Sequence, residues 1–235
     1  MNRNFFRKRP QFESTLCQLL LPGRLSLPRI VVQNLFPEAD SIPVILTKLS
    51  QGEWSTPIND VVQLLKIVVC IKPHRILELG SYEGSTAMLM AQNTKDDCII
   101  VAVDQFDWHG KVYAGSSLAA RIERRIGKSS AEMFAGDVDQ SFDLIYVDAD
   151  HTYQGVKRDT ELCLRLVKHD GFILWHDYAN WGRLSAANGV VEYLNDLSES
   201  LPLCVIQKSA VALHRPSWID SRREEFERLR KGGEA

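Results

Sequence analysis

Acidic and histidine side chains stand at the ends of two predicted strands. The run FDLIYVD ends at Asp148, and Asp150 and His151 follow within three positions. The run GFILWHDY contains His176 and Asp177 where its apolar part ends. Neighbouring strands of a parallel sheet lie about 4.8 Å apart and end at one edge, so the two strand-end acids can share a ligand. Asp148 and Asp177 are therefore predicted to form a pair that binds a cation.

A divalent cation removes the repulsion between two such carboxylates. Oxygen ligands favour magnesium, calcium or manganese, and His176 would shift the choice toward a transition metal if it coordinated the ion. His151 is a candidate general base, since an ordinary histidine has a pKa of about 6.5 and can accept a proton at neutral pH. The alternative for each residue is a polar loop or a helix cap, which is the preferred interpretation of Asp150.

The segment RILELGSYEGST carries a second candidate site, for a nucleotide. Gly80 and Gly84 stand where a strand gives way to a helix, so the backbone can pass close to a ligand and the helix start offers free N–H groups. The next predicted strand ends in Asp104, whose carboxylate can bind both hydroxyls of a ribose. Gly136 and Asp137 follow a further short apolar run and could place a side chain near an adenine ring. An ordinary tight turn is the alternative interpretation of the Gly80–Gly84 segment and of the Gly136–Asp137 pair.

Short apolar runs that alternate with helix-like segments predict the elements that position these residues. The predicted strands are Arg75–Leu79, Cys98–Asp104, Phe142–Asp148 and Gly171–His176, with a shorter one at Ala131–Ala135. Helical spacing of apolar residues occurs in Pro57–Ile71, Ser85–Gln92, Ser116–Ile126, Tyr153–Val167 and Gly189–Leu197. This alternation indicates an α/β fold with a doubly wound parallel sheet. Leu203–Gln207 and Ala210–His214 are close enough to form a hairpin.

The chain divides into three parts by composition. Residues 1–50 are predicted to form an N-terminal arm or lid, because five prolines interrupt every long element there. Residues 51–216 hold the α/β domain. Residues 217–235 are expected to be a charged C-terminal helix or tail, with the helix at Arg222–Lys231.

Composition limits the classes of partner. The 235 residues are 45% hydrophobic and 25% charged, which is typical of a globular protein, and the net charge of −2 disfavours nucleic acid and anionic lipid as partners. Five cysteines without a CxxC pair indicate a reducing, cytoplasmic compartment. No apolar run approaches the ~20 residues of a membrane span. The basic N-terminus resembles a signal peptide, but Glu13 and Gln18 interrupt its apolar part.

The nucleotide motifs resemble those of the class I S-adenosylmethionine-dependent methyltransferases. The resemblance covers roughly residues 57–215, through ELGSYEG at 78–84, the acid Asp104 and the Gly-Asp pair before FDLIYVD. It implies a Rossmann-like, mostly parallel seven-stranded sheet with a C-terminal antiparallel hairpin. It also implies a cofactor site in which the backbone of the turn at Gly80 and Gly84 lies close to the methionine part of S-adenosylmethionine, and Glu78 supports this turn. In that site Asp104 would hold the ribose and Asp137 the adenine amine. The residues implied for this site are Glu78, Gly80, Ser81, Gly84, Asp104, Asp137 and Asp148.

The segment VDADHTYQGVKRD and the later LVKHDGFILWHDY narrow the resemblance to one branch of that family. This branch contains sugar O-methyltransferases of macrolide biosynthesis and proteins named cephalosporin hydroxylases. The resemblance implies that Asp148 and Asp177 bind magnesium, or another divalent cation, and that His151 is the base. His176 is a further candidate ligand, because it stands where relatives can carry an acid.

Together these features predict an S-adenosylmethionine-dependent enzyme that methylates a hydroxyl of a small acceptor, such as a sugar or natural product, with the help of a divalent cation. A Rossmann-type NAD(P) oxidoreductase is disfavoured, because no second glycine stands two residues after Gly80. A second alternative is a non-catalytic binding or assembly domain that uses residues 1–50 for a partner. Exchange of the arm between protomers of a homo-oligomer is a further alternative. An RNA methyltransferase is disfavoured by the near-neutral charge.

Overall fold

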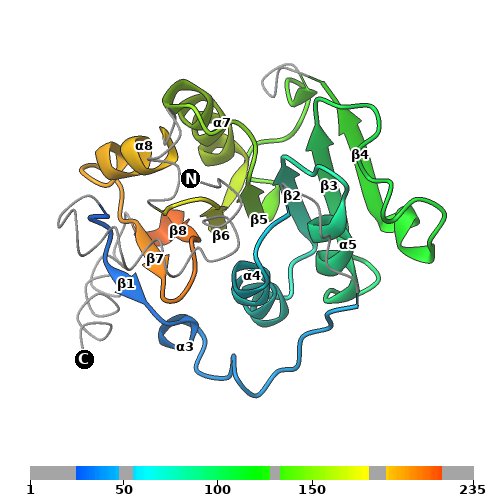
Figure 1. Ribbon diagram of the computed structural model, residues 1–235, viewed down its shortest axis with the longest axis horizontal. Helices are drawn as coiled ribbons and strands as arrows, with labels where there is room; N and C mark the ends of the chain where they lie inside the picture. Colours follow the sequence, from blue (N-terminus) through cyan, green and yellow to red (C-terminus); the bar gives the residue numbers. More distant parts are fainter. Residues whose placement is uncertain (1–24, 48–54, 128–132, 180–188, 219–235) are drawn as a thin grey trace, which may run out of the picture.

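A computed structural model describes residues 25–47, 55–127, 133–179 and 189–218 of the chain (Figure 1). The strands are β1 (Arg29–Ile30), β2 (Arg75–Leu79), β3 (Ile99–Asp104), β4 (Ile122–Ile126), β5 (Phe142–Val147), β6 (Val167–Trp175), β7 (Cys204–Ile206) and β8 (Ala212–His214). The α-helices are α3 (Val32–Leu35), α4 (Ile58–Ile71), α5 (Ser85–Gln92), α7 (Tyr153–Leu166) and α8 (Gly189–Leu197), and η1 (Ser117–Arg121) and η3 (Pro216–Trp218) are short 3₁₀ helices. No helix among these described parts is long and apolar enough to cross a membrane.

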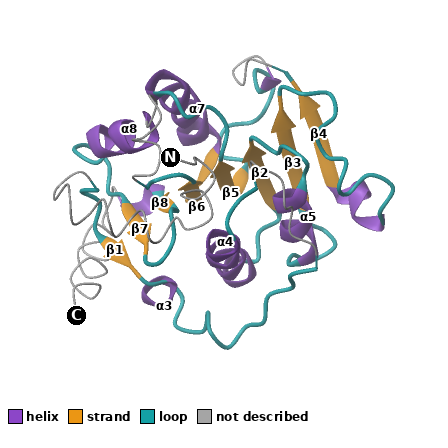
Figure 2. Cartoon of the chain, viewed as in Figure 1, coloured by secondary structure: helices purple, strands orange, loops and turns teal. Residues whose placement is uncertain are grey.

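The strands form one sheet in the order β1-β7-β8-β6-β5-β2-β3-β4. Strands β2 to β6 run parallel, whereas β8 pairs antiparallel with both β6 and β7. Helices α7 and α8 cover one face and α4 and α5 the other (Figures 1 and 2). The predicted α/β fold, its mostly parallel sheet and its C-terminal hairpin are therefore confirmed.

The sheet has eight strands rather than seven, because the predicted arm contributes one. In this arm β1 pairs in parallel with β7, and Ile30 is fully buried. The backbone N–H of Leu27 donates to the hydroxyl of Tyr178, which donates in turn to Asn195. These contacts are made within one chain, and the exchange of the arm between protomers stays a prediction, as do the domain boundaries.

The registers align the carboxyl ends of three central strands. Leu79, the last residue of β2, pairs with Val147, the last of β5, and Val147 pairs with Trp175, the last of β6. Strands β2 and β5 are almost wholly buried, and β6 is buried from Gly171 to Trp175, as their apolar sequences require in a sheet that is covered on both faces. The residues that directly follow the three strands therefore meet at one edge.

Local sequence explains where α4 begins and ends and where α7 begins. Pro57 precedes α4, and Lys72 ends it with a left-handed backbone at φ 53°. Thr152 caps α7, because its hydroxyl accepts a hydrogen bond from the N–H of Gly155. Asp150 accepts from the N–H of Thr152, which agrees with its preferred interpretation as part of the helix start.

The predicted helix at Ser116–Ile126 is wrong. Only η1 is helical there, and the following residues form β4, which pairs with β3 along its whole length. The open edge of β3 outweighs the helix-compatible sequence of this segment, as tertiary pairing commonly outweighs local preference. Of the predicted strand at Ala131–Ala135, the residues 133–135 do not form a strand and the rest lies outside the described residues. The predicted helix at Arg222–Lys231 also lies outside them.

Candidate functional site

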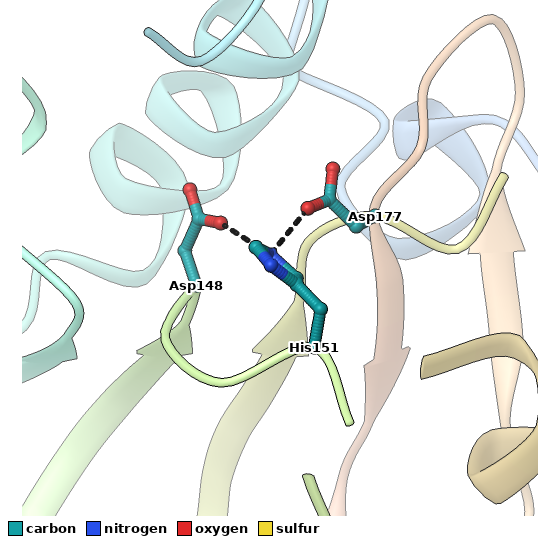
Figure 3. Close-up of side chains that lie close together, drawn as sticks. All are labelled: Asp148, His151 and Asp177. Carbon is teal, nitrogen blue, oxygen red and sulfur yellow. Dashed lines mark ion pairs between the residues drawn. The ribbon is translucent and has the colours of Figure 1, made fainter. Parts of the chain in front are cut away.

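Two carboxylates and an imidazole meet at the edge where the central strands end. Asp148 directly follows β5, His151 lies in the loop before α7, and Asp177 lies two residues after β6. One ligand atom from each lies within 4.8 Å of the others. His151 Nε2 lies 2.6 Å from Asp177 Oδ2 and 3.7 Å from Asp148 Oδ1, with the imidazole directed between the two acids (Figure 3). The sequence placed these three residues together correctly.

His176 lies between these two acids and a third acid, Asp60. Its Nδ1 lies 2.9 Å from Asp177 Oδ1 and 3.3 Å from Asp148 Oδ1, while its Nε2 lies 2.9 Å from Asp60 Oδ2. Both ring nitrogens thus face carboxylates. The structure groups Asp148, His151 and Asp177 as side chains that could hold a metal ion, and the ligand role expected for His176 stays a prediction.

The close pairing shifts the pKa values of the cluster. Burial alone would raise the pKa of Asp148, but His176 and His151 hold it below its ordinary value. The pKa of Asp177 is lowered in the same way, against burial, by His176 and His151. Burial alone would lower the pKa of His151, but hydrogen bonds to Asp148 and Asp177 raise it to about 10. The protonated imidazole of His151 therefore offsets part of the negative charge of these carboxylates, and the raised pKa of His176 adds a second positive charge.

The glycine turn lies at the same edge, directly after β2. Gly80 has φ 89° and Gly84 has φ 88°, a left-handed backbone that favours glycine. A Cβ on Gly84 would lie 2.5 Å from the ring of Tyr113, so this glycine also admits a close side chain from the loop after β3. The carboxylate of Asp104 accepts hydrogen bonds from the N–H of Tyr82 and of Phe106, at 2.7 and 3.1 Å. Asp104 thus joins the turn to the loop after β3.

Replacement of Gly80 by alanine is expected to lower the free energy of unfolding by about 3 kcal/mol, from backbone strain and overpacking together. A Cβ on Gly80 would lie only 2.0 Å from the backbone oxygen of Asp148. Urea denaturation measures the loss. Gly115→Ala is the matched control, because Gly115 has φ 74° with nothing within 4 Å of the added Cβ. Its expected cost is about 1 kcal/mol, and an equal loss in both variants would contradict the close-packing argument.

Buried polar groups beneath the turn fit a bound cofactor. Among the described residues, Glu78 Oε2 and Ser85 Oγ are buried without a hydrogen-bond partner. Burial raises the pKa of Glu78 to about 8, so its carboxyl group is mostly protonated at neutral pH and can donate a hydrogen bond. Ser81 is buried beside Glu78. Because buried polar groups are rarely left unpaired, these atoms favour a polar ligand at the turn.

Asp137 is not part of this edge cluster. Its carboxylate forms ion pairs with Arg125 at 2.6 Å and with Arg75, the first residue of β2, at 3.1 Å. Hydrogen bonds from Arg125, with a smaller contribution from Arg75, hold the pKa of Asp137 below its ordinary value. The adenine-binding role implied for Asp137 stays a prediction, and most of its acceptor positions are already engaged.

Asp60 is a residue of this region that the sequence analysis missed. It lies in the first turn of α4 and is 2% exposed. The helical spacing that indicated α4 carried a signal for it, because Asp60 stands four residues before Leu64 and seven before Ile67, which are both fully buried. An acid on the buried stripe of a helix needs a polar partner, but the sequence alone could not identify that partner as His176.

Comparisons with known proteins agree on the kind of domain. A family model described as a methyltransferase domain matches residues 77–178. The uncharacterised protein y4gI of Sinorhizobium fredii is 28% identical over an alignment of 125 residues, which covers 47% of this chain and 14% of that protein. The matches cover 14% and 52% of the two curated relatives, so the chain corresponds to only part of each.

Solved structures share the fold at low sequence identity. An O-methyltransferase from Bacillus cereus in complex with S-adenosylhomocysteine is 17% identical, with a TM-score of 0.55 over 86% of this chain and 94% of that one. A Podospora anserina methyltransferase with S-adenosylhomocysteine bound is 19% identical, with a TM-score of 0.55 over 86% of this chain and 92% of that one.

Proposed function

We propose that this protein transfers a methyl group from S-adenosylmethionine to a hydroxyl of a small acceptor, because residues 77–178 match a methyltransferase domain and solved methyltransferases share the fold of the chain. The observation that supports a hydroxyl acceptor is the Asp148–His151–Asp177 cluster, which lies at the same sheet edge as the glycine turn. The domain match supports the expected methyltransferase resemblance, and the narrower branch of that family stays a prediction.

S-adenosylmethionine is proposed to bind at the glycine turn. Gly80, Ser81 and Gly84 would line its methionine part, and Asp104 would hold the ribose through a carboxylate that is already fixed by two backbone N–H groups. The unpaired atoms of Glu78 and Ser85 support a polar ligand there. The S-adenosylhomocysteine in the two structures of similar fold supports the same cofactor class.

Asp148 and Asp177 are the residues proposed to hold a divalent cation beside His151, and magnesium and manganese suit such a carboxylate donor set. When bound there, the cation would supply positive charge that stabilises a developing alkoxide and favours the neutral form of His151. Acceptors with two neighbouring hydroxyls fit this cluster best, since both oxygens can approach one ion.

The reaction needs little beyond alignment and removal of one proton. The acceptor oxygen attacks the methyl carbon of the sulfonium, the carbon–sulfur bond breaks toward sulfur, and S-adenosylhomocysteine is left. The hydroxyl proton passes to His151 Nε2, which faces the space between Asp148 and Asp177. The turn and the cluster would hold the two reactants in line, which is the main contribution of the protein to such a transfer.

Titration calorimetry tests the cofactor half directly. The chelator-treated protein is expected to bind S-adenosylmethionine with a micromolar dissociation constant, on the order of 8 kcal/mol of binding free energy, and to show no heat with NAD. Asp104→Asn should weaken that binding, because the ribose loses a charged acceptor. Selective binding of NAD, or no binding of either ligand, would contradict the proposal.

A further inference from the structure

The proposed function leaves one buried carboxylate at this edge without a role. Asp60 enters from α4, on the opposite side of His176 from the candidate metal cluster. Its Oδ2 faces His176 Nε2 at 2.9 Å, and its Oδ1 accepts a hydrogen bond from the N–H of Ala210 at 3.0 Å. Both oxygens of Asp60 are thus engaged, and its side chain has one defined orientation.

The fixed ring of His176 in turn contacts the two acids of the cluster. With Nε2 held by Asp60, the ring directs Nδ1 at Asp177 Oδ1, 2.9 Å away, and at Asp148 Oδ1, 3.3 Å away. The ring is 7% exposed and packs beside the ring of Tyr146, with the centroids 6.3 Å apart. It is therefore confined by packing as well as by its hydrogen-bonding partners.

Asp177 depends on such support. Its backbone lies in the left-handed region at φ 66°, which is unfavourable for a residue with a side chain. One oxygen of its carboxylate faces His176, and the other faces His151 at 2.6 Å. The contact with His176 determines which oxygen of Asp177 is turned toward His151.

We propose that Asp60 is a positioning residue for the candidate metal cluster, because it fixes the ring of His176, which in turn orients the carboxylates of Asp177 and Asp148. This role rests on the proposed function, since it concerns the affinity of the same cluster for a cation. Replacement of a residue that holds a metal ligand in place through a hydrogen bond commonly weakens metal binding by roughly 10–100-fold.

Binding of Mn²⁺ to the chelator-treated protein, followed by electron paramagnetic resonance, tests the role without any acceptor. Asp60→Ala should weaken Mn²⁺ binding by about tenfold or more and leave the affinity for S-adenosylmethionine unchanged. Asp60→Asn should bind Mn²⁺ nearly as the natural protein does, since the amide oxygen can still accept from Ala210 and its NH₂ group can still hold the imidazole. Asp159→Ala removes another buried helical carboxylate and controls for general loss of stability.

The nitrogen resonances of the His176 ring provide a second readout, in the metal-free protein. In Asp60→Asn the NH₂ group must face Nε2, because Ala210 N–H requires the amide oxygen, so Nε2 should change from a proton donor to an acceptor. Unchanged ring nitrogen shifts in that variant would overturn the proposal, even if Asp60→Ala does not fold.

The outcomes separate this role from the proposed function. Equal Mn²⁺ affinity in Asp60→Ala and the natural protein overturns the role of Asp60 and leaves the proposed function intact. Absence of Mn²⁺ binding in the natural protein overturns the cation dependence and this role together, while binding of S-adenosylmethionine is judged by its own titration.

Discussion

Asp148→Asn is expected to weaken divalent-cation binding on the order of 100-fold or more. The substitution keeps the shape of the side chain but removes one of the two carboxylates that face His151. Replacement of a direct ligand should cost at least as much as replacement of a supporting residue, for which losses of roughly 10–100-fold are common. Titration of the chelator-treated protein with Mn²⁺, followed by electron paramagnetic resonance, measures the effect.

Asp150→Asn is the matched control for this experiment. Asp150 lies two residues away in the same loop, but it accepts from Thr152 and pairs with Arg158 at 3.5 Å instead of facing the cluster. Its replacement should leave Mn²⁺ binding unchanged. Similar losses in both variants would show that the loop responds to any loss of charge, and would contradict a specific role for Asp148.

His151→Gln is expected to lower the rate of methyl transfer by about 10²–10⁴-fold, the usual contribution of a general base. Glutamine retains a polar side chain but cannot take up the acceptor proton. The dissociation constant of S-adenosylmethionine should not change, because His151 belongs to the acceptor half of the site. Transfer of a labelled methyl group to a panel of catechols and vicinal diols gives the rate.

His169→Gln controls for the loss of a histidine, since His169 is an exposed residue of β6. This variant should react at the rate of the natural protein. A His151→Gln variant that retains its rate but loses Mn²⁺ affinity would assign His151 to cation binding alone and overturn its role as base.

The positions of Asp148, His151 and Asp177 could be predicted because they depend on short-range patterns. Continuous apolar runs identified β5 and β6, and parallel strands end at one edge, so the residues after them had to lie close together. The glycine turn was found in the same way at the end of β2. These inferences needed only the order of strands and helices.

What the sequence did not reveal depends on contacts between distant segments. The strand β4 forms because β3 offers an open edge, and its own sequence does not distinguish it from a helix. The role of His176 is set by Asp60, whose helix precedes β2, and no local spacing connects the two residues. Asp137 follows a typical turn sequence, and only the folded chain shows that two arginines engage it.

The pairing of β1 with β7 has a consequence for how the molecule folds. The two strands lie near opposite ends of the described chain, and the N–H groups of Val205 and Gln207 donate to Pro28 and Ile30 across that distance. During synthesis the arm emerges long before its partner strand exists, so it must wait until the hairpin has closed. Such long-range closure is entropically costly and comes late. The pairing of β1 with β7, at the edge of the sheet, should also be the first to open in local fluctuations, while the central strands stay paired.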